Sequence, residues 1–264
     1  MKIRTISNFL YKFKIFKRIV PTLLKLMVKF FYIKEIKIIH NNLIFSLNPK
    51  NPIDREIYLK NKYEDGQITF LKKKIDENGI KIFIDIGAHM GFYSINLSKK
   101  KINIHAFEPI IENFNQLEKN IFLNKIHNIK TYNCALSNIK KTSTMWVPDQ
   151  DRTGGFAIYN RNDEDLKKYN IKNITTRVIQ LDIGDDLLDI KNSILAIKID
   201  VERHEEEVLN GINMLLENNE IIIQIEIFNE RKKKIFDLLK NKNYHLIHSI
   251  ENDYYFTNIK NLFK

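Results

Sequence analysis

The pattern of hydrophobic and polar positions becomes regular at about residue 81. From there on, short apolar runs alternate with segments whose apolar residues recur every three or four positions, a pattern typical of strands followed by helices. It predicts strands at Lys81–Ile86, Ile102–Phe107, Ile129–Cys134, Ser193–Ile199, Glu220–Phe228, Tyr244–Ser249 and Tyr254–Thr257. Helices are predicted near Tyr93–Lys99, Ile111–Asn124, Arg203–Glu217 and Glu230–Asn241. The alternation indicates an α/β fold with a doubly wound, mostly parallel sheet, in which one of the last two strands pairs antiparallel at the sheet edge.

The N-terminal segment has a different pattern. Between Ile6 and Phe31 the apolar residues follow helical spacing, with lysines and arginines on the opposite side. Pro21 is expected to divide this segment into two helices, because it fixes φ and lacks an N–H group. We therefore predict that residues 1–75 form a basic amphipathic helical extension and residues 76–264 the α/β domain. Two interpretations of the extension stay open: an element that contacts an anionic membrane, and a cap whose apolar face packs on the following domain.

The regular alternation stops between Thr142 and Leu181, where the stretch TMWVPDQDRTGGFAIYN is punctuated by Gly, Pro and Asp. Such punctuation is typical of an irregular insertion, and long insertions in compact domains often serve as lids. Trp146 and Phe156 are candidates for one wall of a sugar site, or for aromatic side chains that simply hold the loop in place.

Charge is concentrated at the N-terminus. Residues 1–35 contain nine Lys and Arg against Glu35 alone, a net charge of +8, while the remaining residues carry only +3 of the total of +11. The body of the protein is therefore not a basic nucleic-acid-binding surface, and a nucleic-acid partner is not expected. The single cysteine, Cys134, excludes an intrachain disulfide and fits a reducing compartment. We expect a cytoplasmic protein without a spanning helix, with residues 1–35 as a candidate contact with the inner face of a membrane.

The segment KIFIDIGAHMGFYS, residues 81–94, ends a predicted buried strand in Asp85 and opens a turn with Gly87 and Gly91. Ligands of open α/β sheets bind beyond the carboxyl ends of the strands, where glycine allows a tight turn and a close approach. Glu108 ends the next strand, at the spacing where an acid accepts hydrogen bonds from ribose hydroxyls. The third glycine of a dinucleotide fingerprint is missing, and Asp85 would repel a pyrophosphate but suit an ammonium and a sulfonium. The predicted cofactor is therefore S-adenosylmethionine.

Six motifs carry a family resemblance, in the order FIDIGAHMGFYS, AFEPIIENFNQLEKNI, NCALSN, TGG, LD and KIDVERHEEEVLNG. Over about Tyr63–Phe228 the chain resembles the FkbM family of S-adenosylmethionine-dependent methyltransferases. The resemblance implies a class I, Rossmann-like methyltransferase fold and O-methylation of sugars or small molecules. It assigns the methionine end of the cofactor to Asp85, Gly87 and Gly91, the ribose to Glu108, and the adenine to the backbone around Ala135 and Leu136. Ala88, His89 and Pro109 complete the predicted cofactor site.

Two positions depart from the family pattern. His89 stands where the family usually has Asn, so one contact of the cofactor loop is expected to differ. Arg203 stands where the family motif DVEGHE has Gly. A bulky cation at that position is expected to alter the entry to the following helix or to reach toward an acidic substrate.

A second candidate site is the segment KIDVERHE. Lys198 and Asp200 are two residues apart, so both point to the same side of the predicted strand. Such a charged pair is costly to bury unless it is paired or functional. Asp200 or His204 is the candidate general base for an acceptor hydroxyl, with Lys198 orienting the hydroxyl or tuning the carboxylate. A divalent metal on Asp200, Glu202 and His204 was the alternative, but this spacing matches no metal signature, and no metal is predicted.

The predicted function is transfer of a methyl group from S-adenosylmethionine to a hydroxyl of a sugar, a glycan or a small metabolite, as in polysaccharide biosynthesis. One alternative is an RNA 2′-O-methyltransferase, which the low charge of the body disfavours. The other is an inactive, cofactor-binding, membrane-associated module in which Arg203 is the damaging residue.

Overall fold

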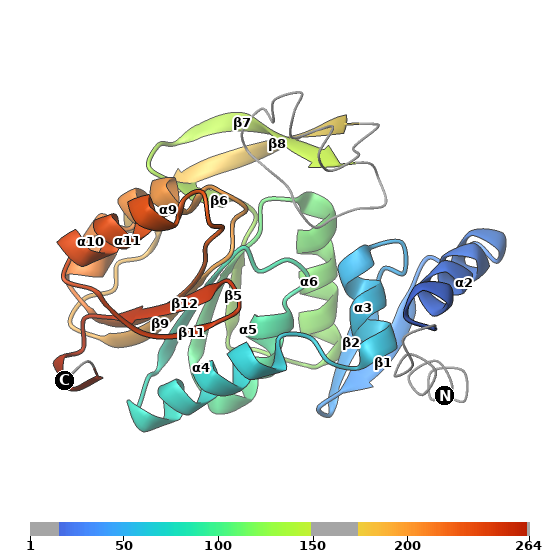
Figure 1. Cartoon of the computed structure of the whole chain (residues 1–264), viewed down its shortest axis with the longest axis horizontal. Helices are drawn as coiled ribbons and strands as arrows, with labels where there is room; N and C mark the ends of the chain where they lie inside the picture. Colours follow the sequence, from blue (N-terminus) through green and yellow to red (C-terminus); the bar gives the residue numbers. More distant parts are fainter. Residues whose placement is uncertain (1–15, 149–173, 263–264) are drawn as a thin grey trace.

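The computed structural model describes residues 16–148 and 174–262 (Figure 1). Its central sheet has the strand order β11-β12-β10-β9-β3-β4-β5. The strands are β3 (Ile82–Ile86), β4 (Asn103–Phe107), β5 (Ile129–Tyr132), β9 (Ile194–Ile199), β10 (Glu220–Glu226), β11 (His245–Ile250) and β12 (Asp253–Thr257). All seven predicted strands are present, and the predicted α/β fold with a mostly parallel sheet is confirmed. The predicted antiparallel pairing at the sheet edge is also confirmed: the edge strand β11 pairs antiparallel with β12, and β12 in turn pairs antiparallel with β10.

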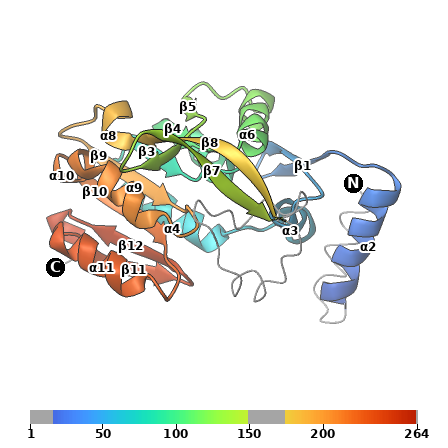
Figure 2. The same cartoon turned by 90° about the horizontal axis from the view of Figure 1, so that it is seen from above.

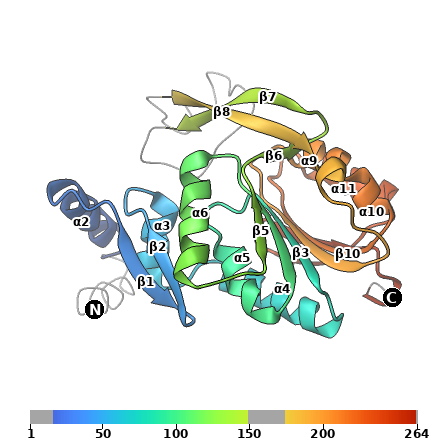
Figure 3. The same cartoon turned by 180° about the vertical axis from the view of Figure 1, so that it is seen from behind.

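Helices cover both faces of this sheet (Figures 1 and 3). One face carries α9 (Glu205–Gly211), α10 (Asn213–Glu217) and α11 (Lys232–Asn241), and the other carries α4 (Asp65–Glu77), α5 (Phe92–Leu97) and α6 (Ile111–Leu123). Short helical segments α8 (Gly184–Leu187), η1 (Ser98–Lys100) and η2 (Lys260–Leu262) complete this part. Strand β3 shows how the sequence serves both layers: Ile84 and Ile86 enter one core cluster, and Phe83 enters the other. Alternate side chains of a strand point to opposite faces, so a nearly continuous apolar run is required.

The prediction of a helical extension over residues 1–75 is wrong in part, because the N-terminal part also contains two strands. It contains α2 (Phe16–Phe30), an antiparallel pair formed by β1 (Ile36–His40) and β2 (Leu43–Leu47), and α3 (Pro52–Lys60). Phe45 of β2 and Leu71 of α4 share a core cluster with Phe83 of β3, so this part packs directly on the central sheet. The predicted break at Pro21 is also wrong, since α2 runs through it. Proline removes one helical hydrogen bond, and the helix tolerates that loss instead of ending.

A second sheet replaces much of the predicted irregular insertion. Strands β7 (Lys141–Pro148) and β8 (Ile174–Ile183) pair antiparallel, and β6 (Ala135–Ser137) pairs parallel with β8. Figures 1 and 2 show this sheet lying across the end of the central sheet from which α9 emerges. These two strands were not predicted, because Pro148 and the glycines after it are typical of irregular structure. Both segments are nevertheless rich in β-branched residues, which favour strands. The TGG motif and Phe156 lie outside the described residues.

No helix within the described ranges is long and apolar enough to cross a membrane.

Candidate active site

A cavity enclosing about 950 Å³, part of it open to solvent, lies at the carboxyl ends of β3, β4 and β9. Its walls come from the loop after β3, from β6 and β7, and from α3. Ten of the twelve predicted site residues line it: Gly87, Ala88, His89, Glu108, Pro109, Ala135, Leu136, Lys198, Asp200 and His204. Asp85 and Gly91 do not.

Gly87 is required by the packing of the loop against the end of β9. Its φ is +84°, and a Cβ built there would lie 1.9 Å from the carbonyl oxygen of Asp200. The N–H groups of Gly87 and Ala88 both donate to the carbonyl of Phe107, which ties the loop to β4. Gly91 has φ +86° and precedes α5, where a Cβ would lie 2.3 Å from Leu117. The two glycines therefore shape the loop through contacts with the protein, and only Gly87 faces the cavity.

His89 occupies the left-handed region, with φ +51°. Asparagine and histidine are among the residues that tolerate this region best, which explains why His can replace the usual Asn of the family. Its N–H donates to Oε2 of Glu108 at 2.8 Å, and the amide of Asn51 donates to its Nε2 at 3.2 Å. Burial lowers the pKa of His89 to about 4, so the ring is neutral at physiological pH. The departure from the family pattern leaves the link between the loop and Glu108 intact.

Glu108 is almost completely buried and faces the cavity from the end of β4. In addition to the N–H of His89, it accepts the N–H of Ile110 at 2.9 Å on its other oxygen. Burial nevertheless raises the pKa of Glu108 to about 7. Each oxygen retains acceptor capacity, so the carboxylate is suited to bind ribose hydroxyls.

The cavity wall beyond Glu108 is apolar. It is formed by Phe107, Pro109, Ile110, Ala135, Leu136 and Met145. Such a wall suits a planar base, and the same cavity is also lined by the carboxyl group of Glu108 and by the charged pair of Lys198 and Asp200. The residues present therefore fit S-adenosylmethionine, with the adenine against the apolar wall and the methionine end near Gly87, His89 and Asp200.

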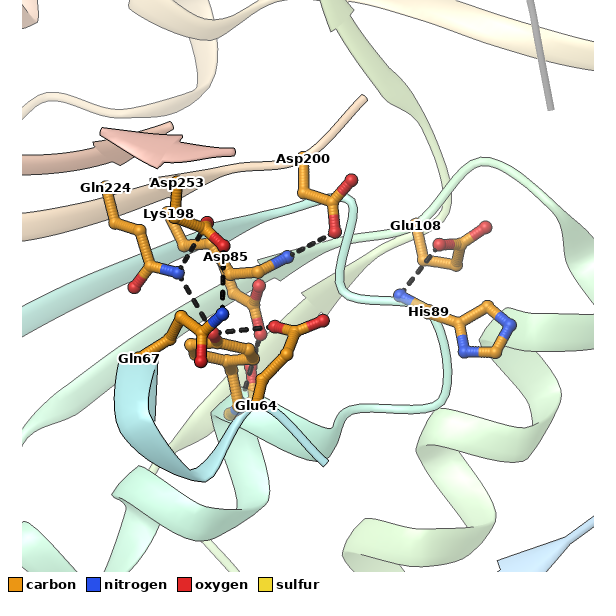
Figure 4. Close-up of polar contacts among 11 residues, drawn as sticks. Glu64, Gln67, Asp85, His89, Glu108, Lys198, Asp200, Gln224 and Asp253 are labelled. Carbon is orange, nitrogen blue, oxygen red and sulfur yellow. Dashed lines mark hydrogen bonds and ion pairs between the residues drawn. The ribbon is translucent and has the colours of Figure 1, made fainter. Parts of the chain in front are cut away.

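The charged region centres on Lys198, which is almost fully buried at the end of β9 (Figure 4). Its Nζ donates to Oδ2 of Asp200 at 3.0 Å and lies 4.9 Å from the centre of the Tyr93 ring. Burial opposes its charge, but the carboxylates of Asp200, Asp85 and Glu64 outweigh burial and raise the pKa of Lys198. Burial likewise opposes the charge of Asp200, yet Lys198 outweighs it and lowers the pKa of that carboxyl. Both groups are therefore charged at neutral pH.

Asp85 lies behind this pair, away from the cavity. It is the partner of Lys198 in the parallel register of β3 and β9, and its Oδ2 accepts the N–H and the hydroxyl of Ser94 at 3.1 and 2.6 Å. Burial raises the pKa of Asp85, although Lys198 and Ser94 oppose this shift. Asp85 thus reaches the site through the charge of Lys198, and not through a contact with the cavity.

Strands β10 and β12 bring two acids to this region that were not among the predicted site residues. Ile225 of β10 is paired with Ile199 of β9, so Glu226 lies beside Asp200, and β12 pairs Asp253 with Glu226. Burial, together with the charge of Asp200, raises the pKa of Glu226 to about 9. Glu226 is therefore protonated at neutral pH and donates a hydrogen bond to Asp200. Its only signal in the sequence is an acid that ends the apolar run EIIIQIE.

Glu64, also missed, faces the cavity from the turn before α4. Its Oε2 accepts the hydroxyl of Tyr93 at 2.7 Å, and that hydroxyl accepts the amide of Gln224 at 2.9 Å. Gln224 also donates to Asp253 at 2.9 Å (Figure 4). This chain of hydrogen bonds joins the N-terminal part to β10 and β12 and fixes the groups around Lys198.

His204 is buried where α9 begins and has partners of its own. Its Nε2 lies 3.1 Å from the hydroxyl of Ser137, and its Nδ1 lies 3.5 Å from a carboxylate oxygen of Glu207. Burial lowers the pKa of His204. Arg203 pairs with Glu230 at 2.7 Å and does not line the cavity. Within residues 16–148 and 174–262, no three His, Cys, Asp or Glu side chains are grouped so that they could hold a metal ion, including Asp200, Glu202 and His204.

Solved structures of methyltransferases resemble this chain at low sequence identity. One is an FkbM methyltransferase from Methylobacillus flagellatus KT, with 19% identity, 67% of this chain and 43% of that chain covered, and a TM-score of 0.43. Another is the bifunctional kinase-methyltransferase WbdD, with 12% identity, coverage of 79% and 43%, and a TM-score of 0.46. A third is a Pyrococcus abyssi tRNA (uracil-54, C5)-methyltransferase in complex with S-adenosyl-L-homocysteine, with 10% identity, coverage of 85% and 44%, and a TM-score of 0.45. The chain spans less than half the length of each.

No curated protein matches the chain. The family model described as the methyltransferase FkbM domain matches residues 85–246, which include the loop after β3, Glu108, and the pair Lys198 and Asp200. Because this match covers more than half of the sequence, the chain belongs to the FkbM methyltransferase family, and S-adenosylmethionine is the cofactor that this membership implies.

Proposed function

We propose that this methyltransferase acts on a hydroxyl group of a sugar, a glycan or another neutral metabolite. The observation that carries the proposal is the ionised carboxylate of Asp200, which borders the cavity next to the Gly87 loop and is held by Lys198 and Glu226. A carboxylate at this point can accept the proton of an alcohol and orient its oxygen.

Bound S-adenosylmethionine supplies an electrophilic methyl group on a sulfonium sulfur. As the oxygen of a neutral hydroxyl formed its bond to this carbon, the carbon–sulfur bond would break and S-adenosylhomocysteine would leave as a neutral thioether. The oxygen would then carry the positive charge, and its proton would be strongly acidic. Asp200 can take that proton even though its pKa is lowered, because the acid that it faces at that stage is far stronger. Lys198 and Glu226 each donate one hydrogen bond to Asp200. The remaining lone pairs of the carboxylate are therefore available to the hydroxyl group of the acceptor.

The charges around the cavity support a neutral acceptor. Four carboxyl groups line the cavity, those of Glu64, Glu108, Asp200 and Glu202, whereas Lys198 is the one Lys or Arg among the described lining residues. An acceptor with several phosphates would meet these carboxylates without compensating cations. The same feature disfavours RNA, as does the net charge of +3 of the chain outside residues 1–35.

The test supplies the protein with methyl-labelled S-adenosylmethionine and either a neutral glycan extract or total RNA. We expect label in the glycan fraction in a product that resists mild alkaline hydrolysis, as an ether does and a methyl ester does not. Label that enters RNA, or only a base-labile ester, contradicts the proposal.

The role of Asp200 is tested with Asp200→Asn, which is expected to lower turnover by about 100-fold or more while binding of S-adenosylhomocysteine changes little in calorimetry. Asp189→Asn is the matched control, because Asp189 is exposed and forms an ion pair with Lys191 at the surface. His204→Gln is expected to retain most activity, since the ring is occupied by Ser137 and Glu207. If His204→Gln instead abolishes turnover and Asp200→Asn does not, the two roles must be exchanged.

A further inference from the structure

Helix α2 exposes a broad apolar face. Ile19, Leu23, Leu26, Met27 and Phe30 recur at the spacing of a single helix face, and their exposed fractions range from 40% for Met27 to 77% for Phe30. Phe31 and Tyr32 follow directly and are 64% and 86% exposed. Among the α2 side chains that the structure describes, Val20 and Val28, on an adjacent strip, are the fully buried ones. The cap interpretation therefore accounts for a minor part of the apolar surface of this helix.

The same segment carries most of the net charge of the chain. Residues 1–35 have a net charge of +8. In the sequence, Arg18, Lys25 and Lys29 recur at a helical spacing that differs from the positions of the exposed apolar residues. An apolar face beside a basic flank, with aromatic residues at one end, is the composition of helices that lie in the interface of an anionic membrane.

We propose that the exposed face of α2, with Phe31 and Tyr32, inserts into the surface of a membrane that contains anionic lipid. Burial of the apolar side chains and attraction of the basic residues to the lipid headgroups would act together. Charge argues against a second copy of this chain as the occupant, because face-to-face contact would bring two segments of net charge +8 together.

The position of α2 fits this role. In Figures 1 and 3 it lies at one end of the molecule, beyond α3 and the β1–β2 pair, while α10 and α11 lie at the opposite end. Figure 2 shows the same separation from above. Substitutions on the exposed face of α2 are therefore remote from Asp200 and are expected to leave activity on a soluble acceptor unchanged.

The experiment is flotation of the full chain with vesicles of phosphatidylcholine alone, or of phosphatidylcholine and phosphatidylglycerol in equal amounts. We expect binding only to the second kind, and weaker binding at high salt, where screening shortens the reach of the charges. The double variant Leu26→Gln/Phe30→Gln should lower the partition coefficient by about tenfold or more. Met214→Gln on α10 is the matched control, because Met214 is 57% exposed and Leu26 is 58% exposed.

A second variant tests the charge separately. Lys25→Gln/Lys29→Gln should lower binding to the anionic vesicles by about tenfold or more while keeping the apolar face. Equal flotation with both kinds of vesicle, or unchanged flotation of Leu26→Gln/Phe30→Gln, would overturn the proposal. The proposal would also be overturned if the wild type failed to float, sedimented as a dimer, and became a monomer in Leu26→Gln/Phe30→Gln. That result would show that a second copy covers the apolar face. Circular dichroism and binding of S-adenosylhomocysteine verify that each variant is folded.

Discussion

The backbone at Arg203 gives the sharpest prediction about stability. Its φ is +75°, in the left-handed region that only glycine adopts without cost, and glycine is the residue that the family usually has there. The strain arises where the chain turns from β9 into α9. Replacing Arg203 by Gly or by Ala removes the same side chain but changes the strain differently, so a comparison of these two variants isolates the backbone contribution.

The magnitude follows from three contributions. A side chain in the left-handed region costs about 1–2 kcal/mol, which Arg203→Gly removes and Arg203→Ala retains. Glycine loses about 0.4–1 kcal/mol relative to alanine through the entropy of the unfolded chain. The ion pair between Arg203 and Glu230 is partly exposed, contributes about 0.2–1 kcal/mol, and is lost equally in both variants. The free energy of unfolding of Arg203→Gly should therefore exceed that of Arg203→Ala by about 1 kcal/mol.

Urea denaturation of both variants measures this difference. Lys234 of α11 is the control position, because it also forms a surface ion pair, with Glu206 at 2.7 Å, but lies within a regular helix. There the order should be reversed, with Ala more stable than Gly by about 1 kcal/mol. If Ala is also the more stable residue at Arg203, the strain argument is refuted. The wild type and Arg203→Gly should both be active, since Arg203 does not line the cavity, and an active wild type would remove the inactive-module alternative.

Three further predictions concern the site. Because Glu226 has a raised pKa of about 9 and donates to Asp200 while protonated, kcat should fall as pH rises through that value. Glu226→Gln should keep its activity at neutral pH but lose this alkaline decline. If the wild type and Glu226→Gln have the same pH profile, the assignment is contradicted. Since the raised pKa of Glu108 is about 7 and ribose hydroxyls prefer the charged form, affinity for S-adenosylhomocysteine in calorimetry should rise about tenfold across the two pH units centred on that value, and should be flat in Glu108→Gln. In thermal unfolding, Gly87→Ala should lower the free energy of unfolding by about 3 kcal/mol or more, because its Cβ meets the Asp200 carbonyl. Gly66→Ala, where the Cβ meets nothing within 4 Å, should raise the free energy of unfolding by about 0.5–1 kcal/mol. Equal effects of the two substitutions would show that the contact at Gly87 is relieved elsewhere.

Much of the fold could be predicted because the strands of the central sheet are buried on both faces. Such strands appear in the sequence as apolar runs that end in a charged or small residue, as at Asp85 and Asp200. The location of the site could also be predicted, because the carboxyl ends of parallel strands lie at one end of a sheet, where ligands bind. Strands β7 and β8 are partly exposed and lack this signature, and their pairing joins residues far apart in the sequence.

The orientation of side chains was less predictable than their position along the chain. Asp85 ends strand β3 and Gly91 lies in the loop after it, as predicted, yet Asp85 is paired with Lys198 and a Cβ at Gly91 would meet Leu117, so neither lines the cavity. Glu226 was missed since its role depends on the strand beside it. That β10 follows β9 in the sheet, and that Ile225 pairs with Ile199, cannot be deduced from either segment alone.

The two candidate sites of the sequence form one electrostatic unit. The register of β3 and β9 places Asp85 beside Lys198, and two residues further along, just after both strands end, Gly87 lies against the carbonyl of Asp200. The negative charges of Asp85 and Asp200 both raise the pKa of Lys198, and the positive charge of Lys198 in turn lowers the pKa of Asp200. These three groups lie where the loop after β3 begins. A motif that was predicted to bind the cofactor and a motif that was predicted to remove a proton thus depend on the same buried lysine. This dependence explains why an acid that does not face the cavity belongs to the first motif.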